Sequence, residues 1–350
     1  MAVEKFEPTT NGTHPDALHS ALHADASIDV DAALKELDVL TLLDDLDREL
    51  VGLEHVKARI RELAHFMLVD RLRHRAGLTR VAPTLHMCFT GRPGTGKTTL
   101  ALKMATILHR LGYLPQGHLV VATRADLIGQ YVGHTAPKTR EVLKRAAGGV
   151  LFLDEAYHLY RPDNQRDYGR EAIEMLLEAM ENRRDELVVI FAGYKEKMHR
   201  LFEGNPGLYS RIAHHIDFPN YTLPELMLIA ELMLSQQMYH WDFHAQAAFE
   251  QCLRPCLSLS YFANAREVRN AIDRIKLKQA QRLVRQAGRI SKQELARIDA
   301  SDVRQSWTCE SSIDVQDRIG EPRSRQRLPT PTVPPARLGL FSWWRWPTLL

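Results

Sequence analysis

Residues 83–102 read PTLHMCFTGRPGTGKTTLAL, and this stretch decides the fold of the chain. Its first residues form an apolar run that suits a buried strand, and its last residues place apolar side chains at helical spacing. Between them, Gly91, four further residues, Gly96, Lys97 and Thr98 complete the G-x-x-x-x-G-K-S/T pattern of a phosphate-binding loop. The sequence therefore predicts an anion site between a strand and a helix.

The residue types of this loop suit the phosphates of a nucleotide. Glycines let the backbone curl so that its N–H groups point at an anion, and the helix dipole adds partial positive charge there. Lys97 can neutralise the outer phosphates, and the Thr98 hydroxyl can hold a magnesium ion. The predicted binding loop consists of Gly91, Arg92, Pro93, Gly94, Thr95, Gly96, Lys97, Thr98 and Thr99. A glycine-rich turn without a ligand is the alternative interpretation.

A second apolar run, residues 149–153, ends in Asp154 and Glu155. This run predicts a strand that delivers two carboxylates to the carboxyl edge of a parallel sheet, where open α/β sheets bind ligands. Asp154 would complete the shell of the magnesium ion, and Glu155 would polarise the water that attacks the terminal phosphate of ATP. A strand that ends in two acidic residues is also an ordinary structural feature, so the prediction depends on the phosphate-binding loop upstream.

Strands and helices alternate after the loop, which predicts a parallel sheet with crossover helices. We expect strands at 85–89, 118–122, 149–153 and 187–192, and helices at 99–111, 137–147 and 168–182. The fourth strand is followed by Gly193 and Tyr194 where related ATPases place a polar sensor, so no sensor is assigned there. The nucleotide-binding domain is expected to span residues 34–221.

The remaining segments differ in composition. Residues 1–33 carry few large apolar side chains, so we expect a mobile extension. Residues 34–50 predict an amphipathic helix, and the break at 51–53 is either a turn between helices or a wall of the adenine site. Residues 222–300 contain further helical patterns, and prolines crowd residues 301–350, which we expect to be disordered.

Composition and charge restrict the function. Lys and Arg number 46 against 43 for Asp and Glu, so net charge gives no argument for binding nucleic acid. No apolar run approaches the roughly 20 residues that cross a bilayer, and the acidic first 47 residues, which lack arginine, are unlike a transit peptide. Four scattered cysteines favour reduced thiols. We expect a cytoplasmic protein without nucleic-acid or membrane partners.

Six segments together resemble a known superfamily. They are FTGRPGTGKTT at 89–99, GQYVGHTAPKT at 129–139, GVLFLDEAYHLYRPDN at 149–164, VVIFAGY at 188–194, NPGLYSRIAHHIDFP at 205–219 and FANAREVRNAIDR at 262–274. This ordered set resembles the AAA+ ATPases and, within them, the CbbX family of red-type Rubisco activases; the alternative is a close relative such as the sporulation protein SpoVK, which would remodel another protein. The resemblance implies an α/β P-loop AAA+ domain, with a parallel five-stranded sheet flanked by helices, followed by a small α-helical lid domain.

The resemblance also implies an assembly. In a hexameric ring the nucleotide lies between subunits, and Arg211 matches the arginine finger that a neighbour supplies. A guanidinium that reaches across an interface can stabilise charge on the transferring phosphoryl group. Arg266 matches a second sensor on the lid. Without the resemblance, a surface arginine that pairs with a carboxylate is the simpler interpretation of Arg211.

Tyr131, Val132 and Gly133 match a pore loop that grips a polypeptide, although a tyrosine packed into its own subunit is the alternative. The implied substrate is the carboxyl-terminal tail of the large subunit of red-type Rubisco, and ribulose bisphosphate is the implied effector. A plastid-encoded relative would work in the stroma. An ATPase that moves nucleic acid and a scaffold that only binds nucleotide are the other classes of function considered.

Overall fold

The computed structural model describes residues 29–78, 83–131, 133–161, 168–286 and 288–307. The observations below concern these residues. The expected mobile extension and the proline-rich tail therefore lie almost entirely outside them.

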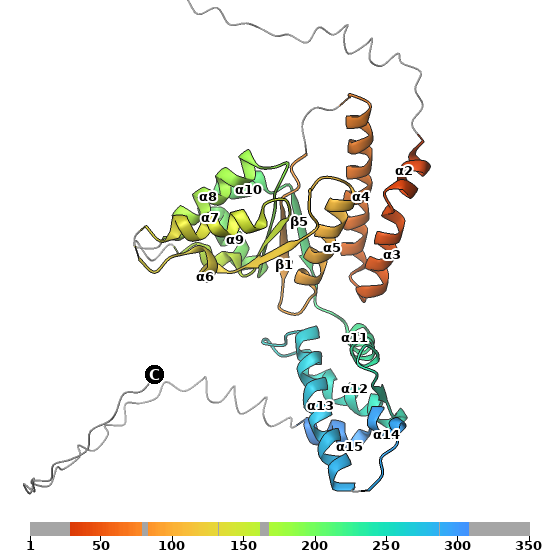
Figure 1. Ribbon diagram of the computed structural model, residues 1–350. Coiled ribbons are helices and arrows are strands. Elements are labelled where there is room, and N and C mark those ends of the chain that lie inside the picture. Colours follow the sequence, from red (N-terminus) through yellow and green to blue (C-terminus); the bar gives the residue numbers. More distant parts are fainter. Residues whose placement is uncertain (1–28, 79–82, 132, 162–167, 287, 308–350) are drawn as a thin grey trace, which may run out of the picture. The chain divides into compact units, whose positions relative to one another are not determined.

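A parallel five-stranded sheet forms the centre of the nucleotide-binding part (Figure 1). Its strands are β1 (Met87–Gly91), β2 (Leu119–Ala122), β3 (Val150–Leu153), β4 (Val188–Gly193) and β5 (His214–Phe218), in the spatial order β2-β3-β4-β1-β5. The first four lie where the sequence patterns predict strands, and β5 is the fifth. β1 lies between β4 and β5 and runs parallel to both. The loop that follows β1 therefore opens at the carboxyl edge of the sheet.

Helices cover both faces of the sheet. Successive side chains of each strand point to opposite faces, so each face has its own apolar core. In β1, Met87 and Phe89 belong to one apolar core and Cys88 belongs to the other. Figure 1 shows the helices of the two sides. The first core includes residues of α3 (Val39–Glu49), α4 (Glu54–Arg75) and α5 (Lys97–Arg110), and the second includes residues of α7 (Thr135–Ala146), α8 (Gly169–Asn182) and α9 (Lys195–Gly204). The shorter α6 (Arg124–Leu127), the 3-10 helix η1 (Ala156–Leu159) and α10 (Pro206–Arg211) lie in the connections.

The single helix expected at 34–50 is wrong. The chain forms α2 (Val30–Glu36) and then α3, with Asp38 between them in the left-handed region at φ 51°. Aspartate tolerates this conformation better than most residues, so the leucine pattern continues across a break in the backbone. A second break follows at Gly52 and Leu53, with φ of 60° and 57°, and turns the chain into α4.

The carboxyl-terminal part is helical, as the lid prediction requires. It contains α11 (Leu223–Ser235), α12 (Phe243–Cys256), α13 (Ala265–Gln286), α14 (Lys292–Ala296) and α15 (Ala300–Ser306), with β6 (His240–Trp241) paired to β7 (Arg297–Ile298). The expected start of disorder at residue 301 is wrong, because α15 packs against α12 and α13 and buries Val303 completely. The folded lid continues to Trp307.

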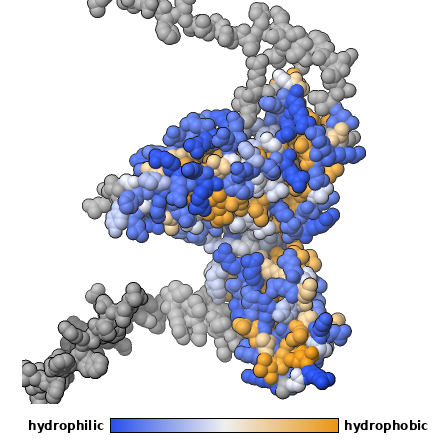
Figure 2. Space-filling model, in the orientation of Figure 1, coloured by the Kyte–Doolittle hydropathy of each residue, from blue (hydrophilic) through white to orange (hydrophobic). Residues whose placement is uncertain are grey.

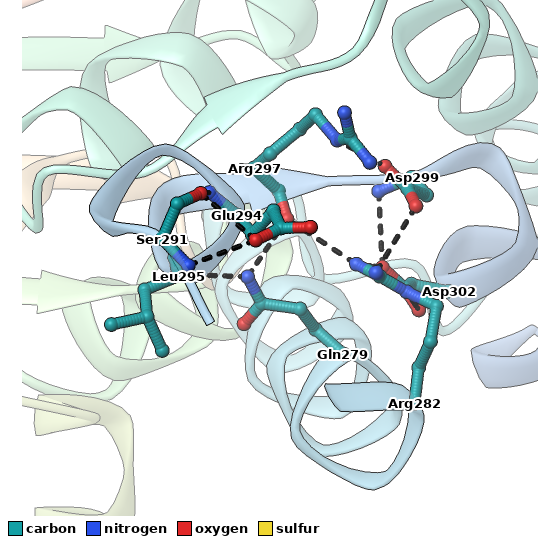
Figure 3. A network of polar contacts seen from close by, with 8 residues as sticks. All are labelled: Gln279, Arg282, Ser291, Glu294, Leu295, Arg297, Asp299 and Asp302. Carbon is teal, nitrogen blue, oxygen red and sulfur yellow. Dashed lines mark hydrogen bonds and ion pairs between the residues drawn. The ribbon is translucent and has the colours of Figure 1, made fainter. Parts of the chain in front are cut away.

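A polar network holds α15 in place (Figure 3). The Arg282 guanidinium donates to both carboxylate oxygens of buried Asp302, at 2.9 and 2.8 Å, and pairs with Asp299 at 3.2 Å. The buried Gln279 amide donates to the Leu295 and Arg297 carbonyls at 3.0 and 2.8 Å. These bonds satisfy polar groups that would otherwise be costly to bury, so residues 290–306 belong to the lid.

The surface in Figure 2 is mostly hydrophilic, with hydrophobic patches that include one on the lid. Apolar side chains exposed there include Phe243, Leu277 and Val284. Among the residues that the structure describes, each helix is too short or too polar to cross a membrane.

Candidate nucleotide site

A cavity of about 640 Å³ opens at the carboxyl ends of β1, β3 and β4. It contains most of the residues that the sequence assigns to binding and catalysis. Those that line it are Gly91, Pro93, Gly94, Gly96, Lys97, Thr98, Thr99, Asp154, Glu155 and Arg266. Segments about 170 residues apart in the chain thus converge on one cavity.

The loop between β1 and α5 requires glycine at two positions. Gly94 and Gly96 have φ of 72° and 94°, a region that other residues rarely adopt. A Cβ atom on Gly94 would also lie 2.1 Å from the Ala263 carbonyl oxygen, so the start of α13 touches the loop directly. The Ala265 N–H donates to the Gly94 carbonyl at 3.2 Å. The loop therefore turns tightly into the N-terminus of α5 and leaves N–H groups and a helix dipole directed at the cavity.

Lys97 is a buried cation at this end of the cavity. Its side chain is only 8% exposed, and its Nζ donates to the Gly91 and Arg92 carbonyls at 3.0 and 2.7 Å. The pKa of Lys97 is lowered to about 8, chiefly by burial; the negative charge of Asp154 opposes this shift, and the positive charge of Arg266 adds to it. A bound anion would replace the missing countercharge, so the electrostatics of the site favour a phosphate.

The acidic pair follows β3 as the sequence predicts. The Asp154 N–H donates to the Ala122 carbonyl at 2.9 Å, which continues the pairing with β2. Glu155 then turns into the left-handed region at φ 50°, and its N–H donates to the Asp154 carboxylate at 3.0 Å. Both carboxylates face the cavity that Lys97 and Thr98 line. Hydroxyl and carboxylate oxygens are the ligands that Mg²⁺ prefers, so Thr98 and Asp154 fit a magnesium ion.

Part of the cavity lining is apolar, and little of this part was predicted from the sequence. Its walls include Leu50 and Val51 before α4, and Ile229 and Met233 of α11. The break at 51–53 thus contributes a wall, which favours the adenine interpretation over that of a simple turn. Only the chain break indicated this wall, and nothing in the spacing of α11 indicated that its apolar residues would face a ligand.

Tyr221 links the phosphate-binding loop to the start of α13. Its hydroxyl donates to the Thr95 carbonyl at 3.3 Å, and its N–H donates to the buried Asn264 side chain at 3.0 Å. Burial raises the pKa of Tyr221 to about 12, so the hydroxyl remains protonated as a donor. The loop and the first turn of α13 are held together by this tyrosine, which the sequence analysis missed.

Two residues of the predicted binding loop have side chains outside the cavity lining. The Arg92 guanidinium donates to the Leu259 and Ser260 carbonyls ahead of α13. The Thr95 side chain is fully buried, and its hydroxyl donates to the Arg92 carbonyl at 2.8 Å. Both side chains support the shape of the loop, whereas Arg269, which was not predicted, lines the cavity beside Arg266.

Arg211 is not among the residues that line its own chain's cavity. It ends α10, where its Nε lies 3.2 Å from a Glu181 carboxylate oxygen and its Nη1 donates to the Gly207 carbonyl at 3.2 Å. The side chain is 34% exposed. Within one chain, the structure therefore gives Arg211 the partner expected of a surface arginine.

The predicted pore loop precedes α7. Tyr131 is 66% exposed and contacts His134, with ring centroids 5.5 Å apart. Gly133 has φ 81°, and Val132 lies outside the described residues. The tyrosine is not packed into its own core, which disfavours the alternative interpretation.

Comparisons with known proteins identify the family of the chain. The model for the "ATPase family associated with various cellular activities (AAA)" matches residues 87–220, and the "AAA lid domain" model matches residues 222–312. The chain is 58% identical to the chromosomal protein CbxX of Cupriavidus necator over 77% of its length and 86% of that protein. It is 56% identical to the chloroplastic ribulose bisphosphate carboxylase/oxygenase activase of Cyanidioschyzon merolae, over 80% and 96%. It is 53% identical to protein CbbX of Cereibacter sphaeroides, over 87% and 99%. The chain is therefore an AAA+ ATPase that belongs to the CbbX and CfxQ family.

Proposed function

We propose that this ATPase is a red-type Rubisco activase, which uses ATP to release inhibitory sugar phosphates from Rubisco. The observation that carries the proposal is the cavity in which Lys97, Thr98, Asp154, Glu155 and Arg266 meet. It occurs in a chain that is 56% identical to a protein named as a Rubisco activase. The cavity supports the energy-yielding step, and the relatives support the substrate.

The residues of the cavity divide the hydrolytic step between them. Lys97 and the N–H groups at the start of α5 bind the phosphates, and Arg266 adds positive charge from the lid. Glu155 accepts the proton of the attacking water, and its exposed carboxylate, 58% accessible, is open to solvent in the cavity. A magnesium ion held by Thr98 and Asp154 supplies additional charge neutralisation when it is bound.

Arg211 supports an assembled enzyme. Because the side chain does not line its own cavity, it can act on a nucleotide only from another subunit. We propose a homo-hexamer in which the Arg211 of one subunit reaches the cavity of the next. The exposed apolar side chains of α13, Leu277 and Val284, suit a surface that is covered on assembly.

Tyr131, Val132 and Gly133 complete the proposal as a pore loop. An exposed aromatic side chain offers a large contact area to an extended peptide, and Gly133 at φ 81° permits the loop to move. The proposed peptide is the carboxyl-terminal tail of the Rubisco large subunit, pulled briefly into the pore. Ribulose bisphosphate is the proposed effector, and the proposed location is the cytoplasm of a bacterium or the stroma of a plastid.

The test measures ATP consumption by the purified full chain, with and without ribulose bisphosphate and inhibited red-type Rubisco. The proposal expects stimulation by both and recovery of carboxylase activity. Stimulation by DNA instead would replace the proposed substrate with nucleic acid.

A matched pair of variants tests the pore loop. Tyr131→Ala is expected to keep basal ATPase activity and to lose Rubisco reactivation, whereas Tyr131→Phe keeps the aromatic surface and should retain both. Unchanged reactivation by Tyr131→Ala would remove the pore loop from the proposal.

A further inference from the structure

The carboxylate of Glu155 has a partner that neither the sequence motif nor the family assigns. The Tyr157 hydroxyl donates to Glu155 Oε1 at 3.1 Å, from the first turn of η1. Tyr157 lines the same cavity as Asp154 and Glu155. A hydroxyl two residues after the proposed base therefore lies within the site.

Tyr157 is itself held firmly. The residue is only 9% exposed, and its ring lies 4.4 Å from that of His158 and 6.1 Å from that of Tyr194, measured between centroids. A Cβ atom on Gly193 would lie 2.7 Å from the Tyr157 ring, so β4 approaches the ring as closely as glycine allows. The Lys197 ammonium lies 4.7 Å above the same ring. The hydroxyl thus has a fixed position.

The hydroxyl can act only as a donor to the carboxylate. Burial, followed by the nearby Glu155 charge, raises the pKa of Tyr157 well above its ordinary value. The phenol therefore keeps its proton, and a protonated phenol beside a carboxylate oxygen donates.

Glu155 needs such a restraint more than Asp154 does. Its backbone lies in the left-handed region at φ 50°, where a residue other than glycine persists only when its surroundings fix it. Its side chain is long and 58% exposed, so without a partner the carboxylate would sample several rotamers. Among the described residues, the other neighbour of the carboxylate is His158, whose Nε2 lies 3.8 Å from Oε2, beyond hydrogen-bond distance.

We propose that Tyr157 is the positioning residue for Glu155: it holds Oε1 and leaves Oε2 free to accept the proton of the attacking water. The inference rests on the proposed role of Glu155 as the base. Holding a general base in its productive geometry affects turnover and leaves nucleotide binding unchanged.

The test uses Tyr157→Phe in the full chain, which removes the hydroxyl and keeps the ring. Turnover should fall by about tenfold, because small misplacement of a reacting group costs that much or more, while KM for ATP stays within about twofold. Tyr160→Phe, which changes the same residue type three positions later, is the matched control and should keep both constants. A kcat that is unchanged or higher in Tyr157→Phe would overturn the inference, and a higher kcat would identify the bond as a restraint on hydrolysis.

A double-mutant cycle separates positioning from general damage. In a Glu155→Gln background, measured by single turnover, Tyr157→Phe should have no further effect, because the position of a side chain that cannot act as a base no longer limits turnover. If Tyr157→Phe lowers the rate of turnover equally in both backgrounds, the inference is contradicted. Thermal unfolding and ATP-binding measurements show whether the variant is folded. If Glu155→Gln itself keeps normal turnover, the proposed base fails; if it is inactive and Tyr157→Phe is normal, only the present inference fails.

Discussion

The nucleotide cavity and the corner around Arg211 each contain a basic residue of the α/β domain, and these two residues are in different states. In the cavity, Lys97 is buried, donates to backbone carbonyls and, among the described residues, has no carboxylate in an ion pair. At the corner, Arg211 is partly exposed and already pairs with Glu181, which also pairs with Arg184.

We propose that this difference separates nucleotide binding from hydrolysis. A buried cation without a counter-ion favours the arrival of an anion, so one chain can bind nucleotide unaided. An arginine in a half-exposed ion pair can exchange its partner at small cost, because such pairs contribute little to stability. We therefore propose that one subunit suffices for binding and that the catalytic site is completed between subunits.

Removal of the corner's guanidinium should have the largest effect. Arg211→Ala is expected to lower ATP turnover by about 10³-fold, the order found for arginine fingers, while the affinity for ATP is retained. Equilibrium binding and steady-state turnover measure the two quantities. A variant that loses binding as well would place Arg211 within its own cavity and erase the distinction.

Removal of the base in the cavity comes next. Glu155→Gln should bind ATP normally and turn it over at least about 10²-fold more slowly, since the amide cannot accept the proton of water. Asp126→Asn, a similar change outside the cavity, serves as the control. Normal turnover in Glu155→Gln would transfer the role of base to another group.

The buried lysine predicts a pH dependence that the corner does not share. The pKa of Lys97 is about 8 without nucleotide, and bound phosphates would raise it, so binding takes up a proton at alkaline pH. The affinity for ATP should fall by about tenfold from about pH 7 to about pH 9. In Lys97→Arg, which stays charged, any remaining affinity should not change with pH. If the affinity of the parent protein for ATP did not change with pH, Lys97 would not have a lowered pKa in the site.

The ion pair at the corner should matter least. Glu181→Ala is expected to leave turnover within about threefold of the parent and to change stability by less than about 1 kcal/mol, because the pair is partly exposed. Arg211 also keeps its bond to the Gly207 carbonyl in this variant. If Glu181→Ala were as inactive as Arg211→Ala, Arg211 would act through Glu181 within its own subunit.

The sequence predicted what depends on local chemistry. The glycine loop has a fixed spacing because phosphate binding needs a particular backbone, and the acidic pair directly follows a strand. The strands are recognisable as apolar runs because they are buried on both faces. The cavity lining contains Lys97, Thr98, Asp154, Glu155 and Arg266 as a result.

Contacts between distant segments were not predictable in the same way. Tyr157 and Tyr221 are isolated tyrosines, and only their place after Glu155 and before α11 hints at a role. Arg92 is part of the loop motif, yet its guanidinium reaches the segment ahead of α13, which no local pattern indicates.

The predicted end of the lid at residue 300 was wrong for a physical reason. Residues 301–306 looked like the start of a polar, proline-rich tail, but Asp302 forms a buried pair with Arg282 on α13. A partner 20 positions upstream turns a polar residue into a core residue, and composition alone does not show that.

The most direct test of hydrolysis between subunits mixes two inactive variants. Arg211→Ala supplies an intact cavity and Glu155→Gln supplies an intact finger, so a mixed ring contains interfaces that join the two. Equal mixing should restore activity at up to about a quarter of the interfaces, as expected for random assembly of a ring with head-to-tail contacts. Turnover well above that of either variant alone is the predicted result; a mixture no more active than its components would contradict an arginine that acts from a neighbouring subunit.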